Sequence, residues 1–194
     1  MRSMSRHAHL DELLRKHGAS DPREEGFRIR MLELLGKGDD SFSRDHFDPG
    51  HFTASAFILS PNRTELLLIL HAKLGLWLQP GGHVELNDAD VLAAARREAK
   101  EEVGLTQLQL LSTGIVDVDI HTIPAGREPA HLHFDVRFLF GSPTRDLVAA
   151  SDARDARWVP FGAVASHHSD ASVMRALATI EARDDVTAPR ADRL

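Results

Sequence analysis

The sequence of 194 residues contains no cysteine and no tyrosine. Without cysteine the chain can form no disulfide bond, no cysteine-ligated zinc site and no thiol nucleophile. Any catalytic chemistry must therefore use other side chains.

Long apolar runs and basic clusters are missing as well. No stretch is apolar for long enough to act as a signal peptide or to cross a membrane, so we expect a cytoplasmic protein without a membrane partner. The 23 Lys and Arg residues against 29 Asp and Glu residues give a net charge of −6, with histidine neutral. Because no basic stripe is present to neutralise phosphates, duplex nucleic acid is not an expected partner. A small ligand, bridged to the protein by a metal ion, fits this charge better.

The composition suits one globular domain with a terminal extension, since 42% of the residues are hydrophobic and 27% are charged. Asp21 followed by Pro22 predicts the start of a helix, and apolar residues recur at helical spacing over 27–35, before Gly36. We therefore expect a helical extension over residues 1–50. A main domain over 51–183 and a flexible polar tail over 184–194 complete the predicted organisation.

The middle of the chain changes from a helical period to a strand period. Two apolar runs flank the turn-rich sequence PNRT, which predicts a hairpin, and later stretches alternate polar with apolar residues. The expected strands are residues 53–60, 65–71, 114–123, 130–140 and 156–164. A last helix is expected after Asp170, with Val173, Leu177 and Ile180 facing inward.

The strongest predicted helix covers residues 89–103. Asn87 and Asp88 are expected to cap it, and Gly104 is expected to end it in a left-handed conformation. At about 100° per residue, Glu98, Glu101 and Glu102 gather on one side, away from an apolar stripe. The stripe comprises Leu92, Ala95, Ala99 and Val103.

The three glutamates repel one another, by a few tenths of a kcal/mol for each pair on a helix. They form either a solvated acidic face or a cation site. The sequence favours the cation site, because few basic residues follow at the spacing that would neutralise them. In addition, Gly81 and Gly82 stand just ahead of the helix, where the backbone can approach a ligand closely. Carboxylates at this spacing suit a hard divalent cation such as Mg²⁺.

At this point the segment 81–105, GGHVELNDADVLAAARREAKEEVGL, resembles the Nudix box. The second half of the box is matched in register by Arg97, Glu98, Ala99, Glu101, Glu102, Gly104 and Leu105, and Gly82 matches its first glycine. Asp88 stands where the family has its first glutamate, and the gap that follows has one residue more than the standard box. The longer loop and shorter acid favour a capping role for Asp88 over metal binding.

The resemblance implies a Nudix-type α/β/α sandwich with a mixed sheet, and hydrolysis of a pyrophosphate linkage in a nucleoside diphosphate derivative. Mg²⁺ or Mn²⁺ would be the cofactor, held by Glu98, Glu101 and Glu102, with Gly82 letting the backbone approach it. Arg97 would orient these carboxylates through charge-assisted hydrogen bonds. The partner would be a small nucleotide: a nucleotide sugar, ADP-ribose or a modified nucleoside triphosphate. A homodimer is a further possibility that the sequence leaves open. Dinucleoside polyphosphate hydrolases of the family carry a tyrosine that this chain lacks.

Further residues are candidates for the general base or for substrate contacts. The general-base candidates are Glu85, Asp117, Asp119, Asp135 and Asp155, with Asp155 expected in a loop before a short strand. His131, His133, Asp135 and Arg137 share one face of the predicted strand 130–140. Two histidines and an aspartate could form a zinc site, but contacts with the substrate are the favoured interpretation. Glu85 and Asp155 join them as substrate-binding candidates.

Two other functions use the same scaffold. A nucleotide-sensing Nudix domain binds without turnover, but such domains usually lose box glutamates, and all three are present. An isomerase resembling isopentenyl-diphosphate isomerase relies on a cysteine, which this chain lacks.

Overall fold

The computed structural model describes residues 5–149 and 153–183. The chain begins with helices α1 (Arg6–Lys16) and α2 (Pro22–Leu35), followed by a 3₁₀ helix, η1 (Asp39–Phe42). The side chain of Asp21 accepts a hydrogen bond from the Glu24 N–H and caps α2, and Pro22 occupies its first turn. The helical extension was therefore correctly predicted. The tail expected over 184–194 lies outside the described residues.

The remaining elements are two groups of strands, one before and one after a third α-helix, followed by two helical elements. In chain order they are β1 (Gly50–Leu59), β2 (Glu65–His71), β3 (Trp77–Leu78), β4 (Gly81–His83), α3 (Val91–Val103), β5 (Gln109–Leu110), β6 (Asp117–Ile123), β7 (His131–Gly141), β8 (Ala153–Pro160), η2 (Phe161–His167) and α4 (Ala171–Glu181). The hairpin predicted around PNRT is confirmed as β1 and β2, which pair with Leu59 opposite Leu66. The last helix is confirmed too, with Asp170 as its cap.

Within the described residues, eight strands form one mixed sheet. Its main path runs β3-β2-β1-β7-β5, while β4 pairs with β1, β6 with β7 and β8 with β2. The central strands β1 and β7 are parallel and pair over their whole common length, from Gly50 opposite Leu132 to Leu59 opposite Gly141. The other strand pairs are antiparallel.

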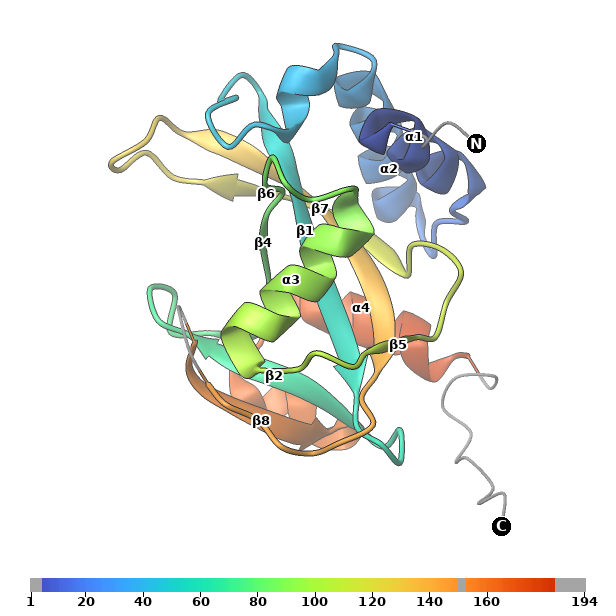
Figure 1. Cartoon of the computed structure of the whole chain (residues 1–194), viewed down its shortest axis with the longest axis vertical. Helices are drawn as coiled ribbons and strands as arrows, with labels where there is room; N and C mark the ends of the chain where they lie inside the picture. The colour runs from blue at the N-terminus through green and yellow to red at the C-terminus, as the bar shows by residue number, and fades with distance from the viewer. Residues whose placement is uncertain (1–4, 150–152, 184–194) are drawn as a thin grey trace.

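Helices cover both faces of the sheet, so the architecture is the α/β/α sandwich that was expected. Helix α3 crosses one face, α4 lies behind the other, and α1 and α2 pack beside α3 at one end (Figure 1). Ala95, Ala99 and Val103 of α3 are fully buried against the sheet, and Val173, Leu177 and Ile180 of α4 are buried on the opposite side. Each helix therefore inserts one apolar stripe, as its 3.6-residue period requires.

The face of the sheet that α4 covers is apolar only in part. Phe57, Leu59 and Leu139 pack under α4, whereas the same face of β1 and β7 carries polar side chains toward the other end of the strands. These polar residues are His51, Thr53, Ser55, His131, His133, Asp135 and Arg137. One face of the central strands thus carries a group of mostly buried polar side chains. In the part of the chain that the structure describes, no helix combines the length and the apolar character needed to cross a membrane.

Candidate active site around the loop between β4 and α3

The loop between β4 and α3 corrects the predicted start of the helix. Helix α3 begins at Val91, and its cap is Asp90, whose side chain accepts a hydrogen bond from the Ala93 N–H at 2.8 Å. The prediction that Asn87 and Asp88 cap the helix was wrong. The loop is one residue longer than in the standard box, and the helix begins two residues later than predicted. Asp90 there caps the helix as Asp88 was expected to do. The predicted end is confirmed, because Gly104 has a φ of 75°.

Asp88 is instead bound to Arg97. Its carboxylate accepts hydrogen bonds from Arg97 Nε at 3.1 Å and from Arg97 Nη2 at 3.0 Å, and it also accepts one from the Glu85 N–H at 2.8 Å. Only 7% of the Asp88 side chain is exposed. The position that departs from the Nudix box therefore closes the loop onto the helix.

Arg97 holds several groups of this loop and helix together. Besides Asp88, its Nη1 donates to Glu98 at 2.8 Å and to Glu101 at 3.0 Å, and its Nη2 donates to the carbonyl of His83 at 2.7 Å. Burial alone would lower the pKa of Arg97, but the hydrogen bonds to Asp88 and Glu98 outweigh it and raise the pKa. The guanidinium therefore stays charged while facing three carboxylates.

Glu98 lies against the glycine pair. A Cβ atom added to Gly82 would lie 2.5 Å from Glu98 Oε1, so any side chain at residue 82 would force this carboxylate to move. Burial raises the pKa of Glu98, and the nearby carboxylates Glu101 and Glu85 raise it further, against the effect of Arg97. The carboxylate is thus held close to the backbone in surroundings that disfavour its charge.

Glu101 and Glu102 differ in their surroundings. The side chain of Glu101 is 50% exposed, whereas Glu102 is only 5% exposed. One oxygen of Glu102 accepts a hydrogen bond from the Gly81 N–H at 3.0 Å. Glu98 and Glu102 therefore border adjacent glycines of β4, and of the three glutamates only Glu101 is exposed to solvent. Their roles as metal ligands stay predictions.

Two of the other candidates lie apart from any buried network. Glu85 is exposed in the loop, and the structure gives its backbone N–H, not its carboxylate, a bond to Asp88. Asp155 was expected in a loop but lies inside β8, because that strand begins at Ala153. It forms an ion pair with Arg157, two residues along the same strand.

The remaining carboxylate candidates belong to one buried ion-pair network. Arg137 is 2% exposed and binds Asp117 at 2.9 Å and Asp135 at 2.8 Å. Arg175 of α4 binds Asp117 at 2.9 Å and Asp119 at 3.1 Å. Such a network satisfies its own charges, so it anchors α4 to β6 and β7. Their predicted roles in substrate binding or base catalysis stay untested.

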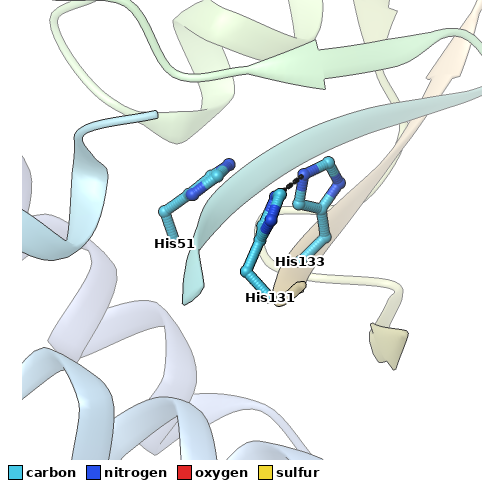
Figure 2. Close-up of side chains that lie close together, drawn as sticks. All are labelled: His51, His131 and His133. Atoms are coloured by element: carbon cyan, nitrogen blue, oxygen red, sulfur yellow. Dashed lines mark hydrogen bonds between the residues drawn. The ribbon is translucent and has the colours of Figure 1, made fainter. Parts of the chain in front are cut away.

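Histidines gather at the open end of the polar face. His131 and His133 were singled out from the sequence, and the structure adds His51 of β1 and His83 of β4 beside them. Figure 2 shows His51, His131 and His133 with their rings close together, at the beginning of β1 and β7. The alternation of His51 with Thr53 and Ser55 on β1 was a usable signal, but it says nothing about which strand lies next to it.

The chain is similar to known proteins in sequence and in fold. The family model described as NUDIX domain matches residues 49–177. A search of curated proteins finds no match. Among solved structures, a NUDIX-family hydrolase from Clostridium perfringens is 26% identical, with a TM-score of 0.52 over 68% of this chain and 97% of that one.

Two further solved structures share the fold at lower identity. The dihydroneopterin triphosphate pyrophosphohydrolase of E. coli is 20% identical, with a TM-score of 0.53 over 65% of this chain and 91% of its own. The NUDIX domain of Shewanella oneidensis NrtR, complexed with ADP ribose, is 16% identical, with a TM-score of 0.55 over 78% of this chain and 96% of its own. Since the family match covers both central strands, the box and most of α4, the chain belongs to the Nudix family.

Proposed function

We propose that the protein is a metal-dependent hydrolase that cleaves a pyrophosphate linkage in a nucleoside diphosphate derivative. The observation that carries the proposal is the set of carboxylates gathered by Arg97 next to Gly81 and Gly82. Nudix membership supports hydrolysis at the level of the family. The substrate and the cation are inferences from the chemistry of the site.

The site suits a divalent cation by its charge. Asp88, Glu98 and Glu101 place three negative charges around the single positive charge of Arg97, which leaves two in excess. Glu102 adds a further carboxylate beside Gly81. The donors are all oxygen atoms, which Mg²⁺ and Mn²⁺ prefer to nitrogen. We therefore assign Mg²⁺ or Mn²⁺ to Glu98, Glu101 and Glu102, with Gly82 allowing close approach of the backbone.

Burial distinguishes what each glutamate contributes. Glu98 and Glu102 are held near the backbone of β4, so they provide a preformed part of the site. Glu101 is half exposed and can leave Arg97 to complete it. When bound, the cation supplies charge neutralisation for phosphate oxygens and a more acidic water at neutral pH. Arg97 positions the carboxylates and acts through them.

The proton acceptor is the second part of the proposal. Asp117 and Asp135 each bind the buried Arg137, and Asp119 binds Arg175, so all three side chains are engaged in ion pairs inside the protein. Glu85 is exposed in the loop that Arg97 closes. We therefore place Glu85 ahead of the buried aspartates and ahead of Asp155 as the general base. Loss of activity in Glu85→Gln with unchanged Mg²⁺ dependence is the expected sign of this role.

A nucleotide sensor is the second candidate function, because ADP ribose is bound by one structural relative with the same fold. Sensing requires binding without turnover. Two measurements across nucleotide sugars, ADP-ribose and modified nucleoside triphosphates separate the two functions. One is phosphate release with and without a phosphatase, and the other is direct binding. Turnover of at least one compound that stops with EDTA supports the hydrolase. Tight binding without turnover of any compound supports the sensor. A cytoplasmic location and a homodimer stay predictions.

A further inference from the structure

A group of histidines lies on the polar face of the sheet, outside the acidic loop. Strand register explains the grouping, because His51 lies opposite His133 in the parallel pair of β1 and β7, and His121 lies opposite His133 in the antiparallel pair of β6 and β7. Ring centroids of neighbouring members lie 4.8–5.4 Å apart. The members are His51, His83, His121, His131 and His133.

Three members lie close enough together to hold one metal ion. In the described residues, His51, His131 and His133 have one ring nitrogen each within 4.8 Å of the other two. His131 Nε2 and His133 Nε2 lie 3.3 Å apart (Figure 2). Two nitrogen ligands of a tetrahedral Zn²⁺, each about 2.0–2.1 Å from the ion, would lie roughly 3.3–3.4 Å apart. The spacing of this pair therefore fits two ligands of one ion, which would displace the proton of the hydrogen bond between the two nitrogens.

Backbone carbonyls fix which ring nitrogen of two histidines is free. His51 Nδ1 lies 3.1 Å from the carbonyl oxygen of His46, and His131 Nδ1 lies 2.7 Å from that of Pro129. Because a carbonyl can only accept, each Nδ1 carries the proton and each Nε2 presents its lone pair. A hydrogen bond from the second ring nitrogen to a carbonyl is the usual support of a metal-ligating histidine.

The second ring nitrogen of His51, Nε2, is buried and unpaired among the described residues. His51 is fully buried, and its Nε2 has no hydrogen-bond partner among the described residues. Buried polar atoms are nearly always paired, so an unpaired one calls for a ligand or an ion.

We propose that His51, His131 and His133 form a second metal site for a transition-metal ion of the Zn²⁺ class, separate from the acidic site at Glu98, Glu101 and Glu102. Three imidazoles suit Zn²⁺ and Co²⁺, whereas Mg²⁺ prefers oxygen ligands. A fourth position is left for a water or for His83, whose ring centroid lies 5.1 Å from that of His51. Through the His83 carbonyl, which accepts from Arg97, the second site adjoins the box loop.

Metal stoichiometry tests the proposal directly. Protein without an affinity tag is stripped with chelator and dialysed against micromolar Zn²⁺, and bound metal is measured in the triple variant Glu98→Gln/Glu101→Gln/Glu102→Gln, which lacks the acidic site. We expect about one Zn²⁺ per chain and a higher melting temperature with Zn²⁺ than with EDTA. Co²⁺ bound to the same protein should show the visible absorption of a nitrogen-ligated tetrahedral or five-coordinate ion. Binding only at millimolar metal, or a Co²⁺ spectrum like that of the hexaaqua ion, contradicts the site.

Variants of the histidines locate the metal. His133→Gln, made in the triple variant, should weaken Zn²⁺ binding at least tenfold, and His51→Gln should do the same. His168→Asn is the matched control, because His168 is exposed and has a φ of 50°, which asparagine tolerates. Unchanged Zn²⁺ affinity in a folded His133→Gln protein overturns the proposal. If a histidine variant does not fold, the Co²⁺ spectrum of the parent protein decides.

Discussion

The backbone of Gly82 lies against the carboxylate of Glu98, so closely that a Cβ atom at residue 82 would lie 2.5 Å from Glu98 Oε1. The end of a glutamate side chain is flexible, so Gly82→Ala should push the carboxylate aside without disrupting the core. We expect activity to fall at least tenfold, with stability changing by about 1 kcal/mol. Gly162→Ala is the control, because a Cβ there meets nothing within 4 Å. Full activity in Gly82→Ala would argue against a role for Glu98 at its present position.

Asp88 should contribute more to the stability of the fold than the helix cap predicted for it from the sequence would. Its carboxylate binds Arg97 through two nitrogens, and hydrogen bonds to charged groups contribute about 1.5–3 kcal/mol each. Asp88→Asn should therefore lower the free energy of unfolding by about 1–2 kcal/mol, measured by urea denaturation. Asp90→Asn should change it little, because asparagine caps a helix as well as aspartate does. A larger loss of stability in Asp90→Asn than in Asp88→Asn would contradict the stabilising role of the ion pair between Asp88 and Arg97.

Comparison of these two aspartates shows what the sequence could predict. Either aspartate can cap a helix, and the longer loop allows α3 to begin after either one. The local sequence therefore could not show which of the two is the cap. The hairpin and the end of α3 at Gly104 follow from short-range rules and were predicted. By contrast, His51 and His133 are 82 positions apart in the numbering and meet through the parallel register of β1 and β7. A long-range pairing of this kind leaves no trace in either segment alone.

The helical extension should loosen in acid because of Glu24. This residue is 1% exposed and binds His17, the Ser20 N–H and the Val118 N–H of β6. Burial alone would raise the pKa of Glu24, but the hydrogen bonds from His17 and Ser20 outweigh it and lower the pKa from 4.5 to about 2. The lowered pKa means that Glu24 stabilises the fold fully above pH 4.5, and that this contribution is lost as the pH falls toward 2.

The acid prediction is measured by comparing Glu24→Gln with the parent protein. The parent should lose stability between pH 5 and pH 2 by on the order of 3 kcal/mol more than the variant does. Glu12→Gln on α1 is the control, since Glu12 is an exposed partner of Lys16. Equal pH dependence in the parent and in Glu24→Gln would exclude Glu24 as the cause.

Divalent metal should stabilise the folded protein through the acidic site. A cation that binds only the native state raises stability by RT ln(1 + [M]/Kd), about 2.7 kcal/mol at a hundredfold excess over Kd. The melting temperature should therefore rise with millimolar Mg²⁺ or Mn²⁺ relative to EDTA, and the rise should be lost in the triple Glu→Gln variant. An equal rise in melting temperature in that variant would show that the cation stabilises the protein from a site other than these glutamates.

Turnover of a nucleoside diphosphate panel by Glu101→Gln and Glu102→Gln at saturating Mg²⁺ tests the central claim most directly. Each change removes a negative charge from the carboxylate set and keeps a similar shape, so circular dichroism should show an intact fold. Glu102→Gln can keep an oxygen to accept from the Gly81 N–H. The account predicts that the parent protein splits at least one compound at its pyrophosphate linkage, and that both variants lose at least nine-tenths of that activity, by analogy with the roughly 10²–10³-fold cost of removing one stabilising group. Parental turnover in both variants would contradict it.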